Sequence, residues 1–191
     1  MKTALKHIAT IQTGVFAKPI EKGEIVYLQA KHFDENGELI ETLYPDLNTD
    51  NKIEKHILKK GDVLFAAKGT KNFAAWFKDK DLPAVASTSF FVIRLNAHFQ
   101  NKILPEFLAW YINQPTSQRF LKMRARGTSM VSISKAVLQE LEIPIPDQIT
   151  QQTILKITHL RSTEKELIRK IGILREKQIQ QKMINAIKYR T

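Results

Sequence analysis

The first part of the chain alternates between short apolar runs and segments with helical spacing. Strands are predicted where β-branched and aromatic residues cluster between turn signals, at residues 25–28, 62–66 and 89–95. Helices are predicted at residues 105–112, which open with a proline, at 116–122, and from Ser134 to Leu138. These elements predict an α+β domain with a mixed or antiparallel sheet and flanking helices.

The pattern changes at Pro144 and Pro146, which favour extended backbone and exclude a helix through them. The rest of the chain has no proline and a single glycine, and its apolar residues recur every three, four or seven positions, which predicts a helix of up to about 65 Å. The stripe that needs a partner is Ile157, Leu160, Leu167, Ile171 and Leu174. Polar residues interrupt the heptads, so a short or imperfect coiled coil is expected, and continuity through Gly172 stays open. The predicted domains are residues 1–146 and residues 147–191.

The composition is that of a folded, basic protein. The chain has 191 residues, 43% of them hydrophobic, and 30 Lys and Arg against 19 Asp and Glu give a net charge of +11. This charge attracts phosphate polyanions, so nucleic acid is the first partner to test, with a merely solvated basic surface as the alternative. The absence of cysteine excludes disulfides, thiolate zinc sites and cysteine nucleophiles. No apolar run suggests a membrane span or signal peptide, and we expect a cytoplasmic location.

Patterns typical of catalytic sites are scarce. The five histidines never lie four residues apart, so no pair would hold a metal on one helix face. Gly69 lacks the preceding glycine of a phosphate loop, and Asp46 and Asp50 are better interpreted as parts of turns than as a nuclease pair. The sequence therefore predicts a binding protein without a catalytic site, metal or cofactor of its own. A small nuclease with an unrecognised site stays an alternative.

Two basic loops are the best candidates for DNA contacts, because they combine cationic, amide and hydroxyl side chains with glycines that allow close backbone approach. The candidates in the first loop are Lys68, Gly69, Thr70, Lys71 and Asn72, and those in the second are Arg124, Arg126, Gly127, Thr128 and Ser129. Weaker candidates are Lys18, Lys22, Lys31, His32, Ser87 and Thr88. The alternative for both loops is that they are ordinary solvated turns. Trp76, Trp110 and the phenylalanines are predicted to lie in the core.

Six segments, taken in order, resemble one repeat of the specificity (S) subunit of type I restriction-modification systems, a target-recognition domain followed by a long helical region. The resembling segments are an opening helix-to-glycine turn at residues 8–14, a first strand with a polar exit at 27–33, a turn, strand and Gly-Thr loop at 58–70, a helix at 104–113, a glycine-rich loop at 126–134, and an exit into the long helix at 141–146 with Gln151 and Gln152. The likeness covers essentially the whole chain.

Such subunits usually carry two recognition domains and two long helices, so this chain resembles a half-subunit. The resemblance implies a non-catalytic homodimer whose antiparallel helices hold two domains over a bipartite site in double-stranded DNA. It also implies a methyltransferase subunit that docks on the helices and uses S-adenosylmethionine to methylate adenine, with a restriction subunit as a further partner. A stand-alone DNA-binding regulator or antirestriction protein stays an alternative. Because Ala66, Ala67 and Lys68 stand where the family often has Ser or Arg, the target sequence does not transfer.

Overall fold

The protein forms two compact units, Met1–Gln151 and Gln152–Thr191. The structure, a computed structural model, describes residues 2–34, 37–40, 42–69, 72–78, 82–125 and 132–188. We refer to Met1–Gln151 as the body. The functional division predicted between residues 146 and 147 stays a prediction, because compactness alone does not define functional domains.

A four-stranded antiparallel sheet forms the centre of the body. The strands lie in the order β2 (Ala9–Thr13), β7 (Phe90–Leu95), β4 (Val63–Ala66) and β5 (Ala74–Trp76). The central strand β7 pairs its Ile93 with Ile11 of β2 on one side and with Val63 of β4 on the other. All three side chains are buried, so this register builds the core of the domain.

Two further strand pairs complete the β structure. The strands β3 (Val26–Leu28) and β6 (Ala84–Ala86) form a parallel pair, and all of their residues are buried. Near the ends of the body, β1 (Lys2–Ala4) pairs antiparallel with β8 (Glu142–Pro144). The second pair joins the start of the chain to the segment that precedes the long helix.

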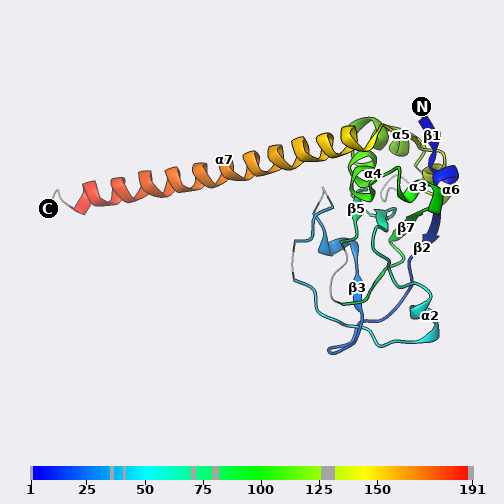
Figure 1. Cartoon of the computed structure of the whole chain (residues 1–191). Coiled ribbons are helices and arrows are strands. Elements are labelled where there is room, and N and C mark those ends of the chain that lie inside the picture. The colour runs from blue at the N-terminus through cyan, green and yellow to red at the C-terminus, as the bar shows by residue number, and fades with distance from the viewer. Residues whose placement is uncertain are drawn as a thin grey trace. The chain divides into compact units, whose positions relative to one another are not determined.

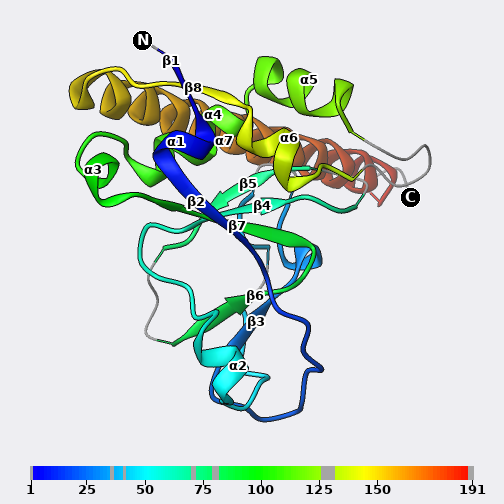
Figure 2. The same cartoon turned by 90° about the vertical axis from the view of Figure 1, so that its right-hand side faces the viewer.

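Short helices surround the sheet. They are α1 (Leu5–Ile8), the 3₁₀ helix η1 (Ala30–His32), α2 (Asn51–Glu54), α3 (Ala97–Gln100), α4 (Pro105–Ile112), α5 (Pro115–Met123) and α6 (Lys135–Gln139). Within the body, α1 and α3–α6 gather at one end of the sheet, whereas α2, β3 and β6 lie towards the other (Figure 2). At the end of α4, the Asn113 amide accepts from the N–H of Ala74 at 2.7 Å and donates to its carbonyl at 2.8 Å, which ties α4 to β5.

A buried ion pair joins β7 to the start of β4. The guanidinium of Arg94 donates to both carboxylate oxygens of Asp62, at 2.8 and 2.6 Å. Asp62 is almost completely buried and also accepts from the N–H of Lys59 at 2.8 Å. The hydrogen bond to Asp62 raises the pKa of the Arg94 guanidinium above its ordinary value.

The first turn of the helix α7 (Gln148–Lys188) is attached to the body by one buried side chain, that of Gln151. We call residues 148–151 the root of α7. The amide of Gln151 accepts from the N–H of Leu104 at 2.8 Å and donates to the carbonyls of Lys102 at 2.7 Å and Pro146 at 2.8 Å. Asp147 caps the first turn, because its carboxylate accepts from the N–H of Thr150 at 2.9 Å and from its hydroxyl at 2.8 Å. These bonds give a physical reason for a glutamine at position 151.

From its root to its end, α7 is a single uninterrupted helix of 41 residues, about 62 Å long (Figure 1). Gly172 does not split it, and a Cβ placed there would meet no other atom within 4 Å. Every side chain at residues 156–187 is exposed, including the stripe predicted to need a partner. Within the described part of the chain, no helix combines the length and the apolar content that crossing a membrane requires.

The predicted α+β class is confirmed, and so are the strands that became β3, β4 and β7 and the helices that became α4–α7. Two predictions for the first part of the chain are wrong. Residues 8–14 were expected to form a helix-to-glycine turn, but only Leu5–Ile8 is helical and Ala9–Thr13 is a strand that pairs with β7. Residues 27–33 do not contain the first strand, because β1 and β2 precede β3; the three-residue strands β1, β5, β6 and β8 are too short to show a period.

Candidate nucleic-acid interface

Loops from four parts of the chain meet at one end of the central sheet. Because β7 runs antiparallel to β2 and β4, its start lies beside their ends: Thr13 pairs with Phe91, and Ala66 pairs with Phe90. The parallel pair β3–β6 leads into the same region, since the N–H of Ser87 donates to the carbonyl of Leu28 at 2.8 Å. We call this region the loop end, comprising residues 14–18, 29–31, 67–69 and 87–89.

Backbone hydrogen bonds hold the loop end together. The N–H of Val15 donates to the carbonyl of Ala86 at 2.8 Å, and that of Ala67 to the carbonyl of Ser89 at 2.9 Å. Gly14 packs so tightly that a Cβ there would lie 2.1 Å from the carbonyl oxygen of Ser87. The loops are therefore presented by a connected backbone scaffold, which is what base reading requires.

The fold brings the stems of the two predicted basic loops together. Lys68 forms an antiparallel bridge with Ser132, and the N–H of Ile133 donates to the carbonyl of Ala67 at 2.9 Å. Lys68 is exposed, and Gly69 has a φ of 137°, a backbone conformation that favours glycine. The predicted residues Thr70, Lys71, Arg126, Gly127, Thr128 and Ser129 lie outside the described residues.

The other two predicted residues of these loops make internal contacts. The Asn72 amide donates to the carbonyl of Ala66 at 2.9 Å and closes the base of its loop. At the end of α5, the guanidinium carbon of Arg124 lies 4.0 Å from the ring centre of Phe120, a cation–π contact on an exposed side chain. That contact orients the Arg124 guanidinium.

A hollow of about 350 Å³ at the loop end contains three of the weaker candidates. It is lined by Phe16, Ala17, Tyr27, Gln29, Ala30, Lys31, Ser87, Thr88 and Ser89. The Ser87 hydroxyl is buried and lies 2.6 Å from that of Ser89, so this pair is bonded internally. Thr88 is partly exposed and Lys31 is exposed. Thr88 and Lys31 are therefore better placed than Ser87 to contact a ligand.

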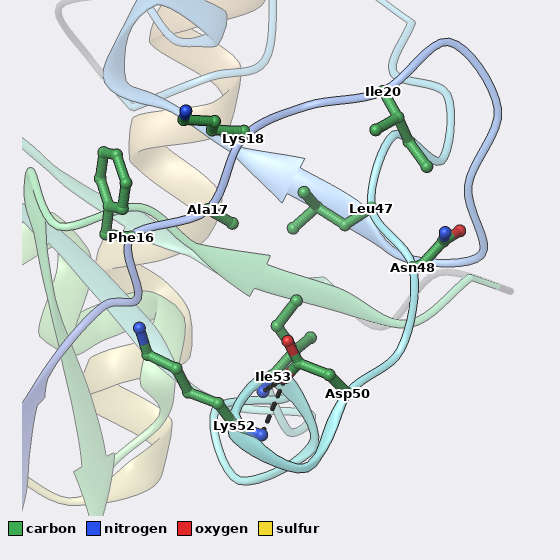
Figure 3. A pocket seen from close by; sticks show the side chains of 9 residues that line it. All are labelled: Phe16, Ala17, Lys18, Ile20, Leu47, Asn48, Asp50, Lys52 and Ile53. Carbon is green, nitrogen blue, oxygen red and sulfur yellow. Dashed lines mark hydrogen bonds between the residues drawn. The ribbon is translucent and has the colours of Figure 1, made fainter.

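A second hollow, of about 270 Å³, lies beside the first and contains Lys18 (Figure 3). Leu47 and Ile53 form its apolar part, and Lys52 adds a second ammonium group. The carboxylate of Asp50 is occupied in capping α2, because it accepts from the N–H groups of Lys52 and Ile53 at 2.8 and 2.7 Å. The one acid that lines this hollow therefore uses its Oδ1 to cap α2.

Phe16 lines both hollows and is 65% exposed. The prediction that the phenylalanines lie in the core is wrong for this residue, although Phe65, Phe90 and Phe107 are fully buried as expected. Sequence reasoning also missed the other lining residues Tyr27, Gln29, Lys52 and Ser89. For Phe16 a signal existed, because it lies between Gly14 and Pro19 in a segment without apolar periodicity.

An aromatic cluster lies beneath the loop end. The ring centres of Phe33, Phe73 and Phe90 lie 5.7 to 6.0 Å apart in all three pairs. These rings come from the segment after η1, from the start of β5 and from the start of β7. The cluster therefore gives the loops a rigid apolar base.

No metal centre is evident in the described part of the chain, where no three His, Asp or Glu side chains gather. His32, a weaker candidate for DNA contact, is buried, and its Nδ1 accepts from the N–H of Gln29 at 3.2 Å. The described side chains at the loop end are thus suited to binding through cations, hydroxyls, an amide and one exposed aromatic ring.

The fold and the loop end define a class of protein in which a rigid α+β scaffold presents polar loops and continues into a long helix. The chain belongs to the family of type I restriction modification DNA specificity domains, which matches residues 3–173. This confirms the resemblance found in the sequence. The family is one of specificity domains and not of catalytic ones, in agreement with the prediction of a non-enzymatic chain.

Individual relatives support this membership. Over 106 residues, 54% of this chain, it is 38% identical to the specificity subunit of the type I restriction enzyme HindI from Haemophilus influenzae. The HsdS subunit from Thermoanaerobacter tengcongensis shares the fold with a TM-score of 0.62 at 20% identity over 88% of this chain. The S subunit from M. genitalium does so with 0.56 at 15% identity over 84%. The chain spans 22% of the HindI subunit and 44% and 38% of the two solved structures.

Proposed function

We propose that this chain is a DNA-recognition half-subunit of a type I restriction-modification system and that the loop end of the body reads double-stranded DNA. The observation that carries the proposal is the convergence of Lys18, Lys31, Lys68 and Thr88 on one rigid end of the sheet in a chain of net charge +11. Cations at a scaffolded loop surface provide phosphate contacts, and neighbouring polar groups provide base contacts.

Different residue types at this surface are assigned to different parts of the DNA. Lysine ammonium groups are point charges, so Lys18, Lys31 and Lys68 are assigned to phosphates. A guanidinium can bond a guanine edge bidentately, so Arg124 and the predicted Arg126 are assigned to base edges or to bidentate phosphate contacts. The hydroxyl of Thr88 and the amide of Gln29 suit base edges, because each can donate and accept. The remaining predicted residues, Gly69, Thr70, Lys71, Asn72, Gly127, Thr128, Ser129 and Ser87, are assigned to shaping the loops and to backbone contacts.

The second part of the proposal is a homodimer formed through α7. Five apolar side chains along one stripe, from Ile157 to Leu174, are each about half exposed or more. An apolar stripe of this length calls for cover by another chain. An antiparallel pair of such helices would separate two bodies and match a bipartite DNA site. The same helices would receive a methyltransferase subunit carrying S-adenosylmethionine, with a restriction subunit as a further partner, in the cytoplasm where the DNA lies.

Coexpression with a candidate type I methyltransferase subunit, followed by mapping of methylated adenines, tests the whole proposal. We expect one bipartite site with two identical half-sites related by a two-fold axis. Two different half-sites would show that a second specificity chain takes part. If the chain binds DNA but no methylation depends on it, it acts alone as a regulator or antirestriction protein, and metal-dependent cleavage by the purified chain would indicate a nuclease.

Salt titration of DNA binding tests the phosphate contacts directly. We expect log K to fall linearly with log salt, and the Lys68→Ala variant to lower the slope by about one unit because one phosphate contact is lost. Lys6→Ala is the matched control: Lys6 is equally exposed but lies on α1, before the start of β2 and therefore away from the loop end. A binding constant that does not change with salt, or equal effects of the two variants on the slope, would contradict the assignment.

A further inference from the structure

The exposure of Phe16 is built into the fold. Both neighbours of Phe16 are bonded to one side chain: the buried hydroxyl of Tyr27 donates to the carbonyl of Val15 at 3.0 Å and accepts from the N–H of Ala17 at 3.3 Å. Gly14, packed against Ser87, fixes the backbone on the preceding side. The backbone on both sides of Phe16 is therefore fixed and holds the ring in solvent. The exposure of the ring does not result from a loose loop.

The surroundings of Phe16 indicate what kind of partner would cover its ring. Of the two hollows that Phe16 lines, the one drawn in Figure 3 contains Lys18 and Lys52, and the other contains Lys31 and Thr88. A protein partner would favour a broader apolar patch than the exposed Phe16 ring and the neighbouring Ile20, whereas a polyanion with an apolar feature fits a small apolar group among cations. In duplex DNA, the thymine 5-methyl group is the apolar feature of the major groove, and phenylalanine is one of the side chains that contact it.

We propose that Phe16 is a specificity-determining residue that contacts the 5-methyl group of a thymine in the target, with the flanking lysines on the phosphates on either side. This inference rests on the proposed DNA-reading function of the loop end. The contact selects thymine because cytosine has no methyl group and a purine presents polar atoms at that place. Holding the ring in place before binding lowers the ordering cost of the contact.

The test is a selection of bound sequences from a random duplex library by the purified full chain and by its Phe16→Ala and Phe16→Leu variants. We expect the wild-type chain to select a motif with an invariant thymine, Phe16→Ala to lose the preference at that one position, and Phe16→Leu to retain part of it. Replacing that thymine by uracil should weaken wild-type binding about fourfold, the factor for one buried methyl group, and leave Phe16→Ala binding unchanged.

Tyr44→Ala is the matched control, because Tyr44 is 75% exposed but lines neither hollow. It should select the wild-type motif. Because both side chains are exposed, neither alanine variant should change the unfolding midpoint, so a changed motif reports recognition and not misfolding.

The possible outcomes distinguish a failure of the proposed DNA-reading function from a failure of the Phe16 contact. If the wild-type chain enriches no sequence, the proposed function fails and the Phe16 contact fails with it. If wild-type and Phe16→Ala select the same motif with the same sensitivity to uracil, DNA reading stands and the Phe16 inference is overturned. If Phe16→Ala changes the motif but uracil has no effect on the wild-type chain, the ring acts as a wedge between bases and the methyl contact is wrong.

Discussion

The body buries its large apolar core side chains, whereas α7 exposes its apolar side chains. In the body, Phe65, Phe90 and Phe107 each expose 1% of their surface or less. Along α7, Leu160 and Leu174 expose 58% and 64%. The body therefore buries its apolar side chains in a core of its own, whereas the apolar surface of α7 would stabilise the protein only when it is covered, in the proposed dimer by a second chain. The two regions should respond differently to mutation and to protein concentration.

The apolar stripe occupies only the first part of α7. At 100° per residue, the five positions from Ile157 to Leu174 cluster on one face, whereas Ile187, sixteen residues after Ile171, lies about 160° away from it. Met183 and Ile184 also lie away from the stripe. We therefore expect the helix pairing to extend over residues 157–174, with the last turns of α7 contributing little to it.

The largest expected effect is in the body. The Phe90→Ala variant removes a fully buried ring from the aromatic cluster, so we expect the free energy of unfolding to fall by about 3 to 5 kcal/mol. Leu167→Ala on α7, measured at a protein concentration where the chain is monomeric, should change the body by less than about 0.5 kcal/mol. Urea unfolding followed by tryptophan fluorescence gives both values, since Trp76 and Trp110 lie in the body. Equal losses of unfolding free energy in the two variants would contradict the contrast between the body and α7.

The next effect should appear only in the dimer. Ile171→Glu places a charge in the expected helix pair, and we expect the dissociation constant of the dimer to rise by about 100-fold, roughly 3 kcal/mol, without a change in the unfolding of the body. Gln180→Glu is the matched control, because nine residues along the helix place it on the opposite face. Sedimentation over a range of protein concentrations measures both. If the wild-type chain is a monomer throughout, the paired-helix proposal is wrong.

The root of α7 is part of the helix and also bonds to the body, so mutations there should lower the stability by an intermediate amount. Gln151→Ala leaves two carbonyls and one N–H of the body without their side-chain partner, so we expect a loss of about 1 to 3 kcal/mol. Gln152→Ala, at the exposed neighbouring position, should cost less than about 0.5 kcal/mol. For the same reason, a chain ending at Pro146 should be less stable than one ending at Gln151. Thermal unfolding of the four proteins checks this, and equal stability would show that the root bonds contribute nothing.

A helix or strand could be predicted from the sequence where the residues that specify it lie close together in the chain. The bounds of α4 were predicted to the residue, because Pro105 marks its start and the apolar spacing marks its face. The strands β1 and β8 could not be predicted, since each has three residues and its partner lies about 140 residues away, as in the pairing of Thr3 with Ile143. Contacts of that separation leave no pattern in a short window.

The residue types of the candidate loops could be named from the sequence, and their role in binding stays a prediction, whereas the way in which the loops meet could not be predicted. The basic loops were recognisable from their residue types, and the bridge between Lys68 and Ser132 brings their stems together. The hollow that joins Lys31 and Thr88 to Phe16 is built from three separate segments, and no spacing in the sequence predicts that they meet. Tyr27 illustrates the same limit, because it was predicted as a strand residue while its hydroxyl holds the Phe16 loop.

The smallest expected effect concerns Asp147, where the body ends and α7 begins. Hydrogen bonds from the N–H and the hydroxyl of Thr150 lower the pKa of the Asp147 carboxyl below its ordinary value of about 3.9. A folded-state pKa below the unfolded one means that the ionised cap stabilises the folded chain above about pH 4 and that this contribution is lost as the pH falls towards the folded-state pKa. An NMR titration of the carboxyl carbon should show the lowered pKa, and Thr150→Ala should raise it. An unshifted Asp147 would mean that the Thr150 bonds do not stabilise the ionised cap, and that the first turn of α7 is held by the bonds of Gln148 and Gln151 to the body.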